Sequence, residues 1–282
     1  MVRIILKRFG KIPKEIENDI IAIVKECYEK IPHNIEIVDI FLFENLSLIK
    51  SFYHQEKEDI GVVTNEFEDY FLARHDAWRG ISRIAICLEA MKKVPKLIQI
   101  GALRHEVAHS ILHGSIEYYV FPVTKALAEA SIKFNLSKQY CINLIYLISI
   151  AVKDFEATKL LLKNGFIEDQ IAYLQYLLKP SNDDLIAWNL SKDNPAAIVL
   201  CLAGRLKDLA CLTALRSTLT LKNIPEFKIT ESLSYIPFNI LEKILSFINK
   251  LPQLMNNDTF HNFNVVMNAF IEDILKPIFI KL

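Results

Sequence analysis

Apolar residues recur with two different periods along the chain. Residues 35–43 (IEIVDIFLF), 69–75 (DYFLARH) and 82–88 (SRIAICL) are rich in branched and aromatic side chains, which is typical of β-strands. Residues 12–31 instead place apolar side chains at helical spacing, and residues 47–55 suggest a short second helix. The first third of the chain therefore predicts a small sheet accompanied by helices.

From Pro95 onward the pattern is helical. Pro95 suits the first turn of a helix and Gly114 suits its C-terminal cap, so we expect one helix over residues 95–113. Two further helices follow. Pro122 and Thr124 are expected to start the first, and the second, longer helix is expected to begin at its cap Ser137 and to run to Gly165.

A domain boundary is expected at residues 179–184 (KPSNDD), because Pro180 stops a helix and the next residues favour caps and turns. This boundary divides the chain into a domain at 1–179 and an all-helical region at 180–282. The predicted fold class is α+β, with a small sheet and one central helix in the first part and helices in the rest.

Composition narrows the classes of function. Lys+Arg and Asp+Glu both number 33, so no dominant electrostatic attraction to nucleic acid or to an anionic membrane is expected. The longest apolar stretch, near residues 140–152, is shorter than the ~18 residues that a membrane span needs. The five cysteines are scattered and the N-terminus does not resemble a signal peptide, so we expect a cytoplasmic protein.

The expected helix at 95–113 contains His-Glu-Val-Ala-His, an H-E-x-x-H arrangement. His105 and His109 lie one turn apart on one helix face, a spacing at which two imidazoles can bind one Zn²⁺. Glu106 would accept a proton from the attacking water instead of binding the metal. The small residues Gly101 and Ala102, one turn earlier, favour a metal site over a helix with ordinary core histidines.

A catalytic zinc ion usually has three protein ligands, so one more donor is required. His113 continues the four-residue series, but relative to His105 the helix has rotated by about 80° and risen by about 12 Å. We therefore expect His113 to be a residue of the last helical turn, favoured there by the helix dipole, and not a ligand.

The better donor lies within residues 151–165 (AVKDFEATKLLLKNG), where Asp154 and Glu156 face roughly opposite ways on a helix. Asp154 shares its face with apolar residues, and a lone buried carboxylate is costly unless it is paired or binds a metal. The face of Glu156 carries three lysines and is expected to be solvated. Asp154 is the favoured third ligand, and Glu156 stays the alternative.

HEVAHSILHG, followed by a helix with an acidic-x-x-A-polar pattern, resembles the gluzincin branch of zinc peptidases. It is particularly similar to the small cytoplasmic peptidases of the phage-repressor and stress-response type, whose following helix carries E-x-x-A-[D/N]. The resemblance implies a zincin-like fold and places Asp154 at the third-ligand position and Thr158 at the outer position. Both depart from the family pattern, since Asp has a shorter reach than Glu and Thr supports a ligand less strongly.

Two further segments offer side chains for a cleft. Residues 73–83 (ARHDAWRGISR) contain His75 and Arg79, which could donate hydrogen bonds to a developing oxyanion; the alternative is a polar turn with Trp78 in the core. Tyr118 or Tyr119 could donate in the same way, although IEYYVF also reads as an ordinary core segment. We select His75 and Tyr119 as catalytic candidates beside Glu106.

The function expected from these residues is a zinc-dependent peptidase that acts on a peptide or protein substrate. The alternative is a catalytically inactive peptidase-like protein whose helical C-terminal region binds or regulates a partner. Neither nucleic acid nor membrane is an expected partner. The sequence leaves the oligomeric state and the cleavage specificity open.

Overall fold

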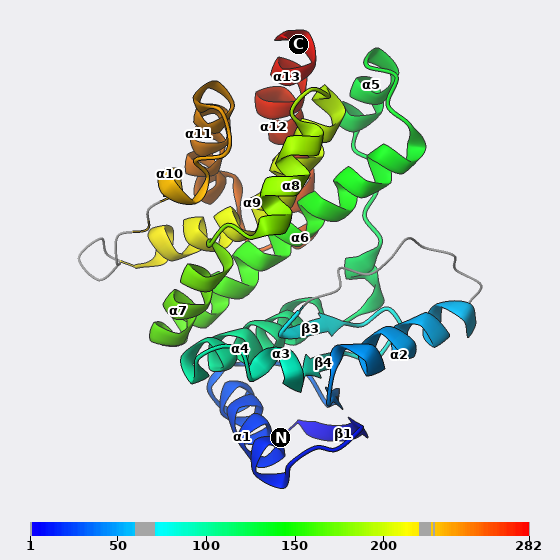
Figure 1. Cartoon of the computed structure of the whole chain (residues 1–282), viewed down its shortest axis with the longest axis vertical. Helices are drawn as coiled ribbons and strands as arrows, with labels where there is room; N and C mark the ends of the chain where they lie inside the picture. Colours follow the sequence, from blue (N-terminus) through cyan, green and yellow to red (C-terminus); the bar gives the residue numbers. More distant parts are fainter. Residues whose placement is uncertain (1, 60–70, 220–226, 228, 282) are drawn as a thin grey trace. The chain divides into compact units, whose positions relative to one another are not determined.

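The computed structural model describes residues 2–59, 71–219, 227 and 229–281 of the chain, which form two compact units (Figure 1). Unit 1 comprises residues 1–119 and 164–173, and unit 2 comprises residues 120–163 and 174–282. Each unit is described by itself below. The chain passes from one unit to the other three times, and the domain boundary expected at residues 179–184 stays a prediction.

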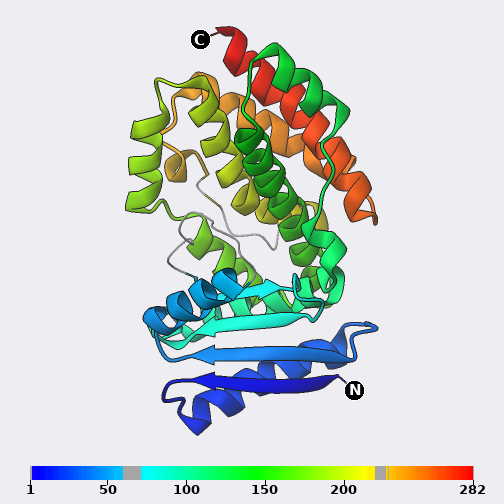
Figure 2. The same ribbon diagram turned by 90° about the vertical axis from the view of Figure 1, so that its right-hand side faces the viewer.

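Unit 1 contains a four-stranded mixed sheet, in the order β1-β2-β4-β3 (Figure 2). Its strands are β1 (Arg3–Phe9), β2 (Ile37–Phe43), β3 (Ala73–Asp76) and β4 (Arg83–Cys87). The first three strands in spatial order are parallel, and β3 runs antiparallel to β4, with His75 opposite Ile84 and Asp76 opposite Arg83. Consecutive residues of β3 therefore face opposite sides of the sheet.

The three β-rich segments of the sequence all contain a strand, although residues 69 and 70 of the second segment lie outside the described part of the chain. β1 was not predicted. It is an edge strand, and its adjacent Lys7 and Arg8 break the apolar–polar alternation that identifies a half-buried strand.

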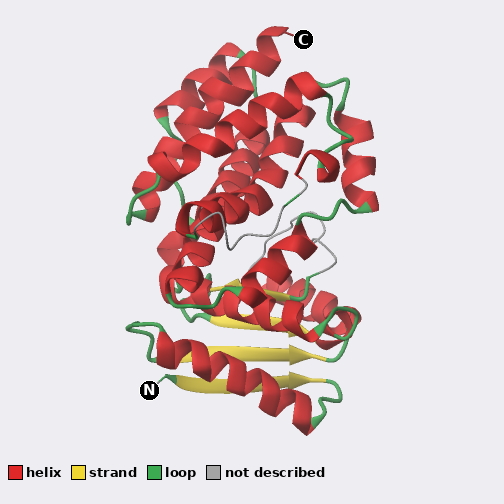
Figure 3. Cartoon of the chain, turned by 90° about the vertical axis from the view of Figure 1, so that its left-hand side faces the viewer, coloured by secondary structure: helices red, strands yellow, loops and turns green. Residues whose placement is uncertain are grey.

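Helices cover both faces of this sheet. α1 (Lys14–Lys30) and α4 (Lys96–His113) pack together, and α1 covers the face turned toward the viewer in Figure 3. α2 (Leu46–Asp59) covers the other face, where its Phe52 ring packs against Phe41 and Phe43. Two short elements, α3 (Leu88–Met91) and the 3₁₀ turn η1 (Ile116–Tyr119), flank α4. The helices expected at 12–31, 47–55 and 95–113 are confirmed, with Pro95 and Gly114 as the caps of α4.

The segment 164–173 completes unit 1 by packing on α4 at Gly101. A Cβ atom at this glycine would lie 2.4 Å from the backbone oxygen of Asp169, so only glycine permits the close approach. Gln170 donates through Nε2 to the Gly101 carbonyl (3.0 Å), and Arg104 donates through Nη1 to Asp169 (2.8 Å). The Tyr173 ring then contacts the His105 ring edge-on, with centroids 5.6 Å apart.

Within its described residues, unit 2 consists of helices. The long helices α6 (Lys138–Lys163) and α9 (Pro195–Thr218) pack along each other and form its core. Around them lie α5 (Lys125–Lys133), α8 (Asn182–Ser191), α10 (Ile229–Ser232), α11 (Phe238–Leu254), α12 (Thr259–Phe270), the π-helical turn η3 (Ile271–Leu275) and α13 (Lys276–Lys281). α7 (Glu168–Leu177) begins in unit 1 and ends in unit 2.

The fold class is therefore α+β, as predicted. The expected helix starts are also confirmed, since Thr124 accepts a hydrogen bond from the Leu127 amide and Ser137 accepts one from the Tyr140 amide. In the described part of the chain, no helix combines the length and the apolar character needed to cross a membrane.

Glu156 differs from its expected surroundings. It is half-buried, and its carboxylate accepts hydrogen bonds from Thr259 Oγ1 (2.8 Å) and from Asn262 Nδ2 (2.5 Å). Asn262 is fully buried on α12. The expectation of a solvated face was wrong for this residue, because α12 packs on α6 there.

We expect Glu156→Ala to lower the free energy of unfolding by about 1–3 kcal/mol, because it removes a partner of the buried Asn262 amide. Urea denaturation measures the change. Glu129→Ala is the matched control, since that carboxylate on α5 is 61% exposed. Equal stability of the two variants would show that the contact with α12 contributes nothing.

Candidate metal centre

Helix α4 buries both motif histidines. Its apolar residues Ala102, Leu103, Val107 and Ala108 are buried, and this packing leaves His105 4% and His109 9% exposed. The two Nε2 atoms lie 3.1 Å apart. Two imidazoles on one tetrahedral zinc ion, with Zn–N bonds near 2.0–2.1 Å, place their nitrogens about 3.3 Å apart. The pair is therefore spaced to share one metal ion.

His113 supports His109 from the next turn. It is buried, its Nδ1 lies 3.2 Å from Nδ1 of His109, and its ring packs edge-on against the Tyr118 ring. When Nε2 of His109 binds a metal, its Nδ1–H can donate to His113 Nδ1, which fixes the tautomer and the ring orientation. Helical geometry places His113 outside the expected ligand set, which stays a prediction. The contact with His109 was not predicted, although the four-residue spacing of the two histidines could have indicated it.

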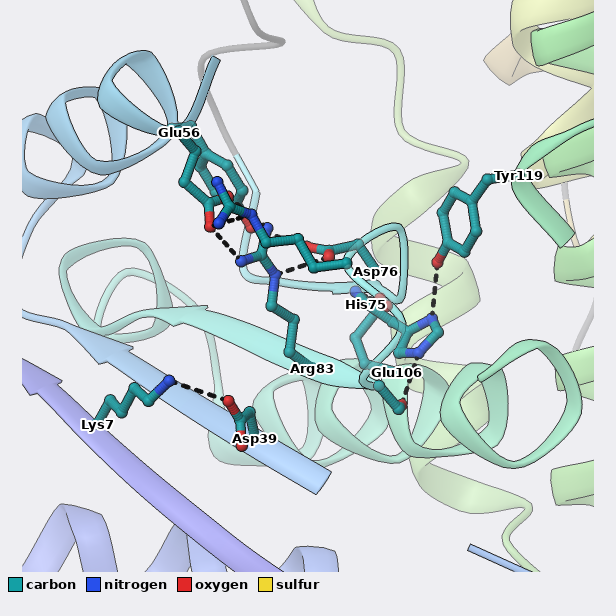
Figure 4. Close-up of polar contacts among 11 residues, drawn as sticks. Lys7, Asp39, Glu56, His75, Asp76, Arg83, Glu106 and Tyr119 are labelled. Carbon is teal, nitrogen blue, oxygen red and sulfur yellow. Dashed lines mark hydrogen bonds and ion pairs between the residues drawn. The ribbon is translucent and has the colours of Figure 1, made fainter. Parts of the chain in front are cut away.

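Glu106 lies beside the histidine pair but faces β3. Its Oε2 atom accepts a hydrogen bond from the backbone N–H of His75 at 2.7 Å (Figure 4). The carboxylate is buried, and this bond holds it at the edge of the sheet. Glu106 is thus held in place beside the histidine pair, and its role as a proton acceptor stays a prediction.

His75 joins β3 to the same cluster. Its ring lies nearly parallel to the His109 ring, with centroids 6.2 Å apart. Its Nε2 lies 2.9 Å from Ser82 Oγ, and its Nδ1 lies 3.3 Å from the hydroxyl of Tyr119 (Figure 4). The structure therefore brings together Glu106, His75 and Tyr119, the three residues that the sequence singled out for catalysis.

Tyr119 keeps its proton in these surroundings. Burial is the main cause that raises the pKa of its phenol well above the usual value, and the negative charge of Asp76 adds to the shift. The phenol therefore stays a hydrogen-bond donor at neutral pH. If it donates to His75 Nδ1, the Nε2–H of His75 donates to Ser82.

Arg79 contacts Glu56 and Trp78. Its guanidinium is 3.3 Å from a carboxylate oxygen of Glu56 and stacks on the Trp78 ring, with Cζ 4.9 Å from the ring centroid. The oxyanion role suggested for Arg79 is not supported by this placement. Tyr118, the other suggested phenol, contacts His113.

Asp154, the predicted third ligand, belongs to unit 2. It is half-buried on α6, and its backbone oxygen accepts a weak hydrogen bond from Cys211 Sγ at 3.8 Å. Its role as a ligand stays a prediction.

Comparison with known proteins adds no relative: no protein-family model, curated protein or solved structure matches the chain. The resemblance to zinc peptidases therefore depends on the motif and its surroundings, and it stays a prediction.

We expect His109→Ala to abolish zinc binding, and His113→Phe to retain one zinc ion per chain with an affinity lower by ~10–100-fold, because only the support of a ligand is lost. Competition with a chromophoric chelator measures both. His261→Phe, at an exposed position on α12, is the matched control. Wild-type affinity in His113→Phe would contradict the supporting role.

Proposed function

We propose that the protein is a zinc-dependent peptidase. The observation that carries the proposal is the pair of buried Nε2 atoms, 3.1 Å apart, with Glu106 held beside them by the His75 amide. A purely structural zinc ion needs no fixed carboxylate next to its ligands, whereas hydrolysis requires a proton acceptor at that position.

Asp154 is the proposed third ligand. His105, His109 and Asp154 offer two imidazoles and one carboxylate, a donor set that could hold a metal ion and that suits catalytic zinc. The alternative, Glu156, is engaged by Thr259 and Asn262.

When bound, the metal ion would polarise the substrate carbonyl and make the attacking water more acidic. Glu106 would take the proton from that water and deliver it to the leaving amine, since its carboxylate is fixed and lies beside the ligands. The hydrogen bond from the His75 amide sets the direction of the carboxylate without occupying the imidazoles.

Tyr119 and His75 are the proposed donors to the oxyanion. The phenol carries its proton at neutral pH, as a phenol of ordinary pKa does, and burial raises its pKa further. Its hydroxyl lies 3.3 Å from His75 Nδ1 and would turn from that nitrogen to donate to the substrate oxygen, which would let His75 reorient as well. A donor of this kind, aimed at the charge that develops on the carbonyl oxygen, is typically worth ~10²–10³ in rate.

We also propose a peptide or protein as the substrate and the cytoplasm as the place of action. All five cysteines of the chain are free, as is usual in a reducing compartment.

Glu106→Gln tests the chemistry. The variant should keep its zinc, because Glu106 is not a ligand, but hydrolysis should fall by ~10²–10⁴ because the amide cannot accept a proton. A broad peptide library is digested with the wild type, this variant and the control Glu117→Gln, which changes an exposed glutamate of η1. Equal cleavage by wild type and Glu106→Gln would exclude the mechanism. If the zinc-loaded wild type cuts nothing, the inactive, partner-binding alternative is favoured.

Asp154→Asn and Glu156→Gln separate the two carboxylates. We expect Asp154→Asn to lower zinc affinity by at least tenfold, since a ligand charge is lost, and Glu156→Gln to leave it unchanged. The chelator competition used for His113 gives both values. Weaker zinc binding in Glu156→Gln alone would reverse the assignment.

A further inference from the structure

A buried ion cluster lies on the α2 side of the sheet and includes Asp76 of β3, the neighbour of His75. The guanidinium of Arg83 on β4 donates to both carboxylate oxygens of Glu56 on α2 at 2.6 Å and to Asp76 Oδ1 on β3 at 2.6 Å (Figure 4). We name Glu56, Asp76 and Arg83 the Arg83 cluster. Its arginine side chain is 5% exposed and connects three separate elements of unit 1.

The cluster is enclosed by aromatic side chains. Four rings have centroids 5.1–5.7 Å from Cζ of Arg83, and they belong to Phe41, Phe52, Tyr53 and Trp78. The Tyr53 hydroxyl also donates to Asp76 Oδ2 at 3.3 Å. The charges are therefore largely desolvated, and their positions are fixed by hydrogen bonds on several sides.

Stability alone does not explain this cluster. Burying charges costs desolvation energy, and apolar residues of similar volume often stabilise a fold as well or better. Burial also raises the pKa of Asp76, and the Arg83 charge is the main effect that opposes this shift. Arg83 thus offsets part of the desolvation of Asp76, and its charge-assisted hydrogen bonds define the geometry of the cluster.

Strand β3 connects the Arg83 cluster to Glu106. β3 has four residues, and in the described part of the chain its sheet partner is β4. Asp76 and His75 are consecutive, so one faces the Arg83 cluster while the other faces α4. The His75 amide holds Glu106, so a shift of β3 along or away from β4 would move the carboxylate's partner.

We propose that Arg83 is a positioning residue, which holds β3 in place so that the His75 amide orients Glu106. The effect of this positioning on catalysis rests on the proposed peptidase function. The link from Arg83 to the His75 amide can be measured without any substrate.

The test compares Arg83→Met with the triple variant Glu56→Leu, Asp76→Leu, Arg83→Met. The single variant removes the buried cation that Glu56 and Asp76 share, although Arg79 still lies 3.3 Å from Glu56, and it should unfold at lower urea. The triple variant should regain wild-type stability and bind one zinc ion per chain. Even so, hydrogen exchange of its His75 amide, followed by NMR, should be at least about tenfold faster than in the wild type. Its kcat should fall ~10–100-fold with little change in KM.

A matched control uses the ion pair Lys7–Asp39 (3.1 Å), which joins β1 to β2 in the same sheet (Figure 4). Lys7→Met with Asp39→Leu should leave His75 exchange and kcat unchanged. Arg83→Lys keeps the charge but not the paired hydrogen bonds, and it should accelerate His75 exchange by a smaller factor.

Wild-type exchange of the His75 amide in the triple variant would overturn the proposal. Should the triple variant fail to fold, wild-type exchange in Arg83→Lys would overturn it equally. A zinc-loaded wild type that cleaves no peptide would refute the peptidase function, while the exchange measurements would still decide whether Arg83 positions His75.

Discussion

The hydrogen bond from the His75 amide to the Glu106 carboxylate is the contact on which the candidate centre depends. It joins the edge of the sheet to α4, the helix that carries both motif histidines. On one side of this bond, His109 and His113 set the orientation of the imidazoles. On the other side, β3 carries His75 toward Tyr119 and Asp76 toward Arg83. The position of Glu106 thus depends both on a helix, whose residue spacing is rigid, and on the short strand β3, which contacts outside α4 hold in place.

The features predicted from the sequence are those set by local periodicity. A spacing of four residues on a helix fixes the shared face of His105 and His109 wherever the helix packs. Branched and aromatic runs likewise identified β2 and β4. β1 was not predicted because it is an edge strand with two adjacent basic residues, and it buries too few side chains to show an apolar–polar alternation. The division of the chain into units also could not be read from local signals, since segment 164–173 belongs with residues far earlier in the sequence.

The features that were missed involve partners distant in sequence. Arg83 reaches Glu56 on a separate helix, and nothing in either local pattern shows that both charges are buried. Glu156 appeared solvated because lysines surround it in sequence, whereas its partners Thr259 and Asn262 are about a hundred residues away. Charged residues that lie on an apparently polar face are therefore the ones whose burial depends most on tertiary packing.

The fit of segment 164–173 against Gly101 has a consequence for how the gene can be rearranged. The histidines and Glu106 are encoded before residue 120, but the segment that covers α4 at Gly101 is encoded after the insertion of residues 120–163. Recombination that transfers only the first 119 codons would carry the motif but expose the α4 surface where Asp169 and Gln170 pack. Exchange between related genes should therefore preserve the whole stretch through residue 173, including the intervening helices.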